Sequence, residues 1–255
     1  MSQSSIRLPG QMVRKSNALI MAKWQPESIW EPRIVALVAS KVTDSDKDFL
    51  IYRIPVMELL GNSGGRMTVE KYKEVAKSIE RLRKATVRIN GDRPCNFRQY
   101  SMFAMCGYEN DYLVAQFHPD LKPHFLQLST QFTAYKLFEY LALPSIYSQR
   151  LYELLLLWSS RKSVELPLRD MHQLLATPQF MRENFKDFRV RVIEKAQKDI
   201  KEKTGLDFEW EPVKQGRAVV AVRFFFARQR GASQLPPVSP GLASAENADC
   251  PHSFS

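Results

Sequence analysis

Residues 185–226 are the stretch of the sequence that most constrains the fold. Apolar side chains recur at every fourth position through its first half, which predicts one long amphipathic helix over residues 185–204. Gly205 ends that helix, and two apolar-rich strands follow, joined by a basic turn at residues 214–217 with residues 218–226 as the returning strand. A cationic helix that leads directly into a hairpin with a basic tip is typical of a winged helix. In that arrangement the helix suits the major groove of DNA and the hairpin reaches adjacent phosphates.

Basic residues gather on the side of this helix that faces away from its apolar stripe. At about 100° per residue, Arg191 and Lys198 point away from the stripe, with Lys195 nearer its margin. The planar guanidinium of Arg191 suits a bidentate contact with guanine, so we expect Arg191 to contact a base edge. Phosphate contacts are expected from Lys186, Lys214 and Arg217. The alternative is a solvated cationic face.

A second helix of this kind is predicted in the first half of the chain. Residues 69–84 have helical periodicity and a good N-cap in Thr68. Lys73, Lys77 and Arg81 form one cationic line, which predicts DNA contact but would equally serve as a soluble face. Three predicted strands follow: residues 86–90, 97–106 and 112–118. Because both halves share an order of elements, the sequence predicts an α+β protein with two tandem winged-helix domains.

The other segments complete this division of the chain. We expect further helices over residues 26–41, 56–60, 126–143, 146–158 and 168–175, strands over residues 49–54 and 164–167, and a loop over residues 176–183. Four parts result: a flexible arm (1–14), winged-helix domain 1 (15–143), winged-helix domain 2 (144–230) and a disordered tail (231–255). The tail is rich in Ala, Ser, Pro and Gly and buries too little to offset its ordering entropy.

The charge of the chain indicates a polyanionic partner. The formal net charge is +10, and the last 25 residues hold two acids and no Lys or Arg, so residues 1–230 carry about +12. Nucleic acid is the commonest such partner, and an anionic membrane is the rival. No apolar run approaches the roughly 20 residues that span a bilayer, and the basic residues are spread over several segments, which favours double-stranded DNA over a membrane. Residues 1–15 lack the apolar core of a signal peptide. The three cysteines have neither metal-ligand nor disulfide spacing, which indicates a reducing cytoplasm.

Patterns typical of enzymes are missing from the sequence. The four histidines never form a His-x-His pair, which excludes the metal site of rolling-circle initiators. Residues 61–68 lack the Gly-Lys-Ser/Thr ending of a phosphate loop, and no carboxylate cluster suggests a nuclease. We therefore expect a binding protein with no catalytic residue, metal or cofactor.

Five segments resemble the plasmid replication initiators that bind iterons, which are repeated sites at an origin. They are residues 15–19 (KSNAL), 147–155 (YSQRLYELL), 185–193 (FKDFRVRVI), 199–204 (DIKEKT) and the wing ending at 214–217 (KQGR). The resemblance implies two winged-helix domains across residues 15–226. It also implies a DNA contact by Arg189, although Arg189 falls nearer the apolar side of the helix and could instead pair with an acid. Val190 departs from the family pattern, because a basic residue often stands there.

The resemblance also implies a mechanism. Family members bind direct repeats as monomers, help to melt the AT-rich origin and recruit the host replication initiator and the replicative helicase. As homodimers they bind an inverted repeat and repress their own gene. The first domain supplies the dimer interface, which places Phe49, Ile51 and Arg53 at or near it. The alternatives are a winged-helix transcriptional repressor without a role in replication, and an RNA-binding or scaffolding protein.

Overall fold

The computed structural model describes residues 11–43, 45–61, 65–91 and 96–226. Most of the predicted arm (residues 1–10) and the whole of the predicted tail (residues 231–255) lie outside the described residues. Cys95 and Cys250 lie outside them as well, and Cys106 is buried as a free thiol.

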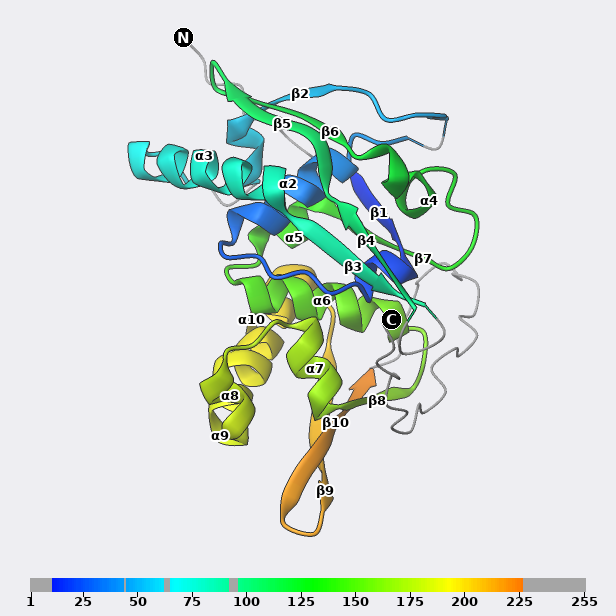
Figure 1. The fold of residues 1–255 in the computed structure, drawn as a ribbon. Helices are drawn as coiled ribbons and strands as arrows, with labels where there is room; N and C mark the ends of the chain where they lie inside the picture. Colours follow the sequence, from blue (N-terminus) through cyan, green and yellow to red (C-terminus); the bar gives the residue numbers. More distant parts are fainter. Residues whose placement is uncertain (1–10, 44, 62–64, 92–95, 227–255) are drawn as a thin grey trace, which may run out of the picture.

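The second half of the chain folds as a winged helix (Figure 1). Its elements are α6 (Ile146–Trp158), β8 (Ser163–Pro167), α7 (Leu168–Leu174), α8 (Gln179–Glu183), α9 (Phe185–Phe188), the π-helix η3 (Arg189–Glu194), α10 (Lys195–Thr204), β9 (Phe208–Gln215) and β10 (Ala218–Phe226). The strands form an antiparallel sheet in the order β8-β10-β9. Gly216 stands in the turn between β9 and β10 with φ +61°, a conformation that favours glycine.

The first half contains the same kind of unit with additions at both ends. Its elements are β1 (Met12–Ser16), α1 (Asn17–Ile20), α2 (Trp30–Ala39), β2 (Tyr52–Pro55), η1 (Val56–Leu60), α3 (Val69–Lys84), β3 (Thr86–Asn90), β4 (Phe97–Ser101), β5 (Phe103–Glu109), β6 (Tyr112–Phe117), η2 (Pro119–Leu121), α4 (Lys122–Phe125), β7 (Phe132–Lys136) and α5 (Leu137–Ala142). The sheet of this unit has the order β2-β6-β5.

The two sheet orders match strand for strand. In each half, the strand after the first long helix (β2 or β8) pairs with the second strand of the wing hairpin (β6 or β10). That second strand pairs in turn with the first strand of the hairpin (β5 or β9). The difference is the β3–β4 hairpin, which is inserted between α3 and the β5–β6 wing of the first half. This shared topology confirms the prediction of two tandem winged-helix domains in an α+β protein.

One predicted element is wrong. Residues 126–143 do not form a helix: they contain strand β7 followed by the short helix α5. Thr133 and Tyr135 are buried while their neighbours in β7 are less so, and β7 pairs antiparallel with β1 from Met12 to Ser16. Strand β1 therefore includes the end of the segment that was expected to be a flexible arm. The partner strand lies more than 100 residues away in the sequence, so periodicity within residues 126–143 carried no sign of it.

Smaller differences concern where elements begin and end. The helix predicted from residue 26 begins at Trp30, so that Pro32 lies in its first turn, where proline is tolerated. The strand predicted over residues 97–106 divides at Met102, whose backbone bonds Ala85 and His118 rather than a continuous partner strand. The predicted loop 176–183 contains the short helix α8.

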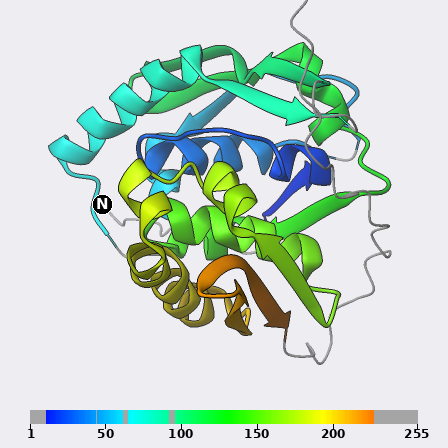
Figure 2. The same cartoon turned by 60° about the horizontal axis from the view of Figure 1, so that its bottom comes forward.

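Helix α6 connects the two halves through buried charges. Glu153, which is 3% exposed, lies with its Oε1 2.7 Å from the Nζ of Lys15 in β1. Arg150 donates to the carbonyl oxygen of Ala22 in the first half (2.6 Å) and to that of Leu174 in the second (3.2 Å). The relative placement of the halves is therefore fixed by specific bonds as well as by apolar packing. Figure 2 shows the resulting stack, with α3 in cyan, α2 in blue and the green and yellow helices of the second half below them.

Candidate nucleic-acid interface

The long basic helix is continuous in the structure but is not α-helical throughout. Segments α9 and α10 flank the six-residue π-helix η3, and the residues at both junctions keep right-handed helical dihedrals. Phe188, Val192, Ala196 and Ile200 are all fully buried. In a regular α-helix every fourth residue drifts by about 40°, because four steps of about 100° exceed one turn. The wider π segment offsets that drift and keeps the four side chains facing the core.

The outward face of this helix carries the predicted DNA contacts. Lys186, Arg191, Lys195 and Lys198 are all exposed on it. The Nε of Arg191 lies 3.4 Å from Asp187 Oδ1, one helical turn earlier, and the Arg191 side chain is 60% exposed. Its guanidinium carbon lies 5.8 Å from the ring centre of Phe180 in α8. Asp187 and Phe180 thus orient Arg191 while its side chain stays accessible.

Arg189 lies differently from its neighbours. Its side chain is 42% exposed, and its Nε lies 3.3 Å from Glu194 Oε1. Arg189 was expected to contact DNA, and this ion pair corresponds to the alternative that it pairs with an acid. Val190, by contrast, is 45% exposed, between Arg189 and Arg191.

The wing of the second half supplies a basic tip beside the helix. Lys214 and Arg217 are exposed on either side of the Gly216 turn. Behind the tip, Arg223 on β10 lies 2.7 Å from Glu165 on β8 and 2.9 Å from Glu211 on β9. The hydrogen bond that Arg223 donates to Glu165 is the main cause of the raised pKa of Arg223, and Glu211 adds to the rise. These cross-strand bonds neutralise the charge of Arg223, so the cationic character of the wing is confined to its tip.

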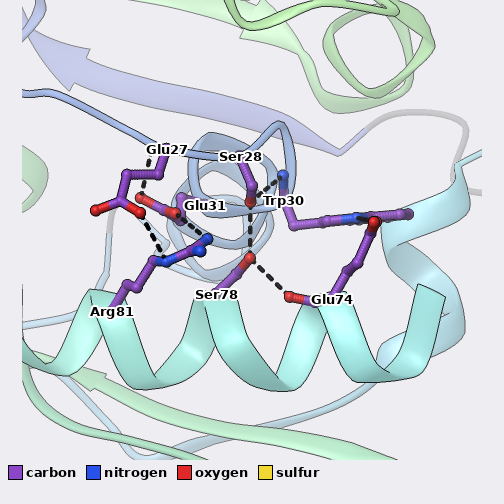
Figure 3. Close-up of polar contacts among 7 residues, drawn as sticks. All are labelled: Glu27, Ser28, Trp30, Glu31, Glu74, Ser78 and Arg81. Carbon is purple, nitrogen blue, oxygen red and sulfur yellow. Dashed lines mark hydrogen bonds and ion pairs between the residues drawn. The ribbon is translucent and has the colours of Figure 1, made fainter. Parts of the chain in front are cut away.

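Helix α3 of the first half carries only part of its predicted cationic line. Lys73 and Lys77 are exposed. Arg81 instead lies with its Nε 3.0 Å from Glu27 and a terminal nitrogen 3.5 Å from Glu31, whose side chain is 3% exposed (Figure 3). Neither acid was among the predicted site residues: Glu27 precedes α2, and Glu31 lies in its first turn.

Two further hydrogen bonds fasten α3 to the segment that begins α2. The indole Nε1 of Trp30 donates to Glu74 (2.9 Å), and the hydroxyl groups of Ser28 and Ser78 are 2.7 Å apart (Figure 3). Together with the Arg81 ion pairs they set the orientation of α3 against the rest of the domain. Arg81 is therefore placed to position the helix rather than to extend the line of free lysines.

The wing of the first half has the opposite charge at its tip. Asn110 and Asp111 stand in the β5–β6 turn with φ 46° and 66°, and Tyr108 donates to Asp111 (2.8 Å). Glu109 lies 3.5 Å from Arg53 in β2. Two carboxylates at this tip would be repelled by phosphates, so this wing differs from the basic wing of the second half.

The three residues expected at a dimer interface are not equivalent. Phe49 is 4% exposed and packs its ring 5.4 Å from that of Phe117, so it belongs to the core of the first half. Ile51 is 60% exposed, and the Arg53 side chain is 51% exposed on β2, an edge strand of the β2-β6-β5 sheet. Of these three residues, only Ile51 and Arg53 are exposed in the folded chain.

Neither a metal site nor a membrane-spanning helix occurs in the described part of the chain. Within the described ranges, no group of three or more His, Cys, Asp or Glu side chains could hold a metal ion. No described helix is both long enough and apolar enough to cross a bilayer. A cavity beside Arg150 and Glu153 has a volume of about 30 Å³, which is room for a single water molecule.

Comparison with known proteins identifies the family. No curated protein sequence matches the chain. Among solved structures, the crystal structure of Pi initiator protein in complex with iteron DNA matches with a TM-score of 0.67 and 18% sequence identity, over 86% of this chain and 98% of that one. The family described as "Initiator Replication protein, WH1" matches residues 12–156, a range that takes in most of α6, and "Initiator Rep protein, WH2" matches residues 167–226. The chain therefore belongs to the family of replication initiator proteins built from two winged-helix domains.

Proposed function

We propose that this protein initiates replication of a plasmid by binding iterons in the double-stranded DNA of its origin. The observation that carries the proposal is the exposed cationic face of the α9–η3–α10 helix, flanked by a basic wing, in a chain of the initiator family. The similarity to a Pi initiator structure solved on iteron DNA supports the same use of this face.

Within this interface the residues have different tasks. Arg191, held at its Nε by Asp187, contacts a guanine with its terminal nitrogens. Lys186, Lys195 and Lys198 contact phosphates along the groove, and Lys214 and Arg217 contact phosphates at the wing tip. Arg189 reaches a phosphate only where its ion pair with Glu194 opens.

The first domain adds a second, weaker contact through α3. Lys73 and Lys77 bind phosphates, and Arg81 keeps α3 in position through Glu27 and Glu31. Two linked contacts on one duplex raise the effective local concentration of each. Strain in the bound DNA then helps to open the adjacent AT-rich segment, to which the host replication initiator and the replicative helicase are recruited.

A homodimer of the chain represses its own gene at an inverted repeat. The β2 edge supports this role, because exposed apolar residues stand just before and after the strand in the chain: Leu50 (58%), Ile51 (60%) and Met57 (55%). An open strand edge of this kind can pair with a second copy. Ile51 and Arg53 contribute to the interface directly, and Phe49 supports the strand from the core.

The test is a footprint of the purified protein on the DNA that flanks its own gene, joined to a replication assay. Protection of tandem repeats, with affinity that falls steeply with salt, and maintenance in trans of a plasmid that lacks its own initiator are the expected results. The matched control is a plasmid whose repeats are scrambled, which should be lost. If the protein silences its promoter but cannot maintain the plasmid, it is a winged-helix repressor. If it does not prefer repeated duplex sites, the proposal fails.

A further inference from the structure

Two exposed apolar side chains accompany Arg191 on the proposed DNA face. Val190, which precedes it in η3, is 45% exposed, and Phe180 in α8 is 50% exposed. Phe185, on the same helix, is by contrast partly buried and packs against the core. A single exposed apolar residue on a surface is ordinary, but Val190 stands among charged residues on the face that our proposed function places against DNA.

The position of Val190 along the helix suits a contact with a base. Recognition helices of helix-turn-helix proteins contact base edges mainly through their N-terminal residues, and Val190 lies in the first half of the helix. Its neighbour Arg191 is the guanine contact. Along a helix, neighbouring residues rise by about 1.5 Å and turn by about 100°, whereas stacked base pairs are about 3.4 Å apart. Val190 therefore stays within one base-pair step of Arg191 while its side chain points to a different part of the groove.

The chemistry of Val190 selects one base. In the major groove, thymine presents a C5-methyl group, whereas the other contacts available there are hydrogen-bond donors and acceptors that an isopropyl group cannot satisfy. A lysine or arginine at this position would add a phosphate or guanine contact instead. Burial of a methyl group against valine favours thymine through the hydrophobic effect.

We propose that Val190 is a specificity-determining residue that binds the 5-methyl group of a thymine next to the guanine bound by Arg191. Phe180, whose ring centre lies 5.8 Å from the Arg191 guanidinium carbon, is a second exposed apolar side chain beside that arginine. This inference rests on the proposed function and names a base that the repeat must contain.

Deoxyuridine provides a sharp test, because it differs from thymidine only by the missing methyl group. Each thymine of a footprinted repeat is replaced singly by deoxyuridine, and the dissociation constant is measured for the full chain and its variants. We expect a loss of about fourfold at one thymine, which corresponds to one methyl group removed from contact. Val190→Ala should bind the unmodified repeat about fourfold more weakly and lose nothing further on that deoxyuridine.

Two variants guard the interpretation. Val190→Thr keeps a methyl group and should retain most of the deoxyuridine effect. Val220→Ala truncates a valine that is 40% exposed on strand β10 of the wing, and it should leave the effect unchanged. Alanine favours helix more than valine does, so Val190→Ala is expected to fold, which circular dichroism will check.

The outcomes separate this inference from the proposed function. Repeat binding that is insensitive to every deoxyuridine overturns the thymine contact and leaves the initiator proposal intact. A deoxyuridine loss that persists in Val190→Ala assigns the methyl contact to another residue and also overturns it. Absence of any preference for repeated duplex DNA overturns both.

Discussion

Replacing Arg81 with alanine tests how α3 is held in its domain. The wild-type guanidinium lies 3.0 Å from Glu27 and 3.5 Å from Glu31. The substitution leaves the Glu31 carboxylate, whose side chain is 3% exposed, without its cationic partner. Breaking a fully buried ion pair costs about 3–5 kcal/mol, whereas a surface pair contributes about 1 kcal/mol or less. Because the Arg81 side chain is 41% exposed, we expect Arg81→Ala to lower the free energy of unfolding by about 2 kcal/mol.

Urea unfolding measures this loss, and two variants define its origin. Lys77→Ala, which removes an exposed lysine one turn earlier, should change stability by less than about 0.5 kcal/mol. Adding Glu31→Gln to Arg81→Ala should recover most of the loss, because a neutral amide needs no cation. If Arg81→Ala unfolds at the wild-type urea concentration but binds DNA more weakly with a shallower salt dependence, Arg81 is a phosphate contact and the positioning role is wrong.

The pH dependence of the same loss follows from Glu31. Burial raises the pKa of this carboxyl group above its ordinary value of 4.5, and Arg81 opposes the rise. Without Arg81 the folded-state pKa rises further, so the folded variant loses stability as pH increases past 4.5 and Glu31 must ionise while buried. The difference between wild type and Arg81→Ala should therefore be largest near neutral pH and shrink as pH falls toward 4.5.

Three other substitutions test separate parts of the structure. Arg191→Ala should weaken repeat binding by about 1–3 kcal/mol and relax the preference at one base pair, as measured on a panel of single base-pair changes; an equal loss on all sequences reassigns Arg191 to phosphate. Gly216→Ala places a side chain at φ +61°, where the new Cβ meets no other atom within 4 Å. Backbone strain alone should therefore lower the free energy of unfolding by about 1 kcal/mol, as measured by thermal unfolding, and Gly216→Asn should lower it by less. Burial disfavours the ionised form of Glu153, but Lys15 and Arg150 outweigh the burial and lower the pKa of this carboxyl group. Glu153→Gln should therefore lower the free energy of unfolding by about 3 kcal/mol at pH 7, and by progressively less once the pH falls below 4.5. A loss of stability that does not depend on pH refutes the ionic role.

The sequence predicted best the long helices and the hairpins that follow them. Helix α3 begins and ends at the residues expected, and the Thr68 hydroxyl accepts from the Lys71 N–H as an N-cap should. Gly205 ends α10 with φ 72°, the left-handed conformation that glycine adopts without strain. The spacing of Phe188, Val192, Ala196 and Ile200 predicted the buried stripe correctly. These residues are four positions apart, whereas a regular α-helix has 3.6 residues per turn. This difference was the one indication of the π segment in the sequence.

The sequence predicted the cationic face of the site but not the role of each residue in it. Exposure of Arg191 and Lys198 followed from the helical wheel alone. The ion pairs of Arg81 did not follow from it, because Glu27 and Glu31 lie in and before the first turn of α2 and become neighbours of Arg81 only when α2 and α3 pack. The resemblance implied that Phe49 lies at or near a dimer interface, but aromatic packing against Phe117 places it in the core.

What the sequence determined by itself was everything set by neighbours a few residues apart: the helical stripes, their caps, the hairpin turns and the cationic face. Tertiary structure alone decided the rest. Pairing with β1 made β7 a strand, and folding brought Lys15, Arg150 and Glu153 together across the two halves. It also placed Arg81 in an ion pair that holds α3 against the segment that begins α2. The physical reason is that periodicity records which side of an element is apolar, whereas strand pairing and buried ion pairs depend on partners brought together only when the whole chain has folded.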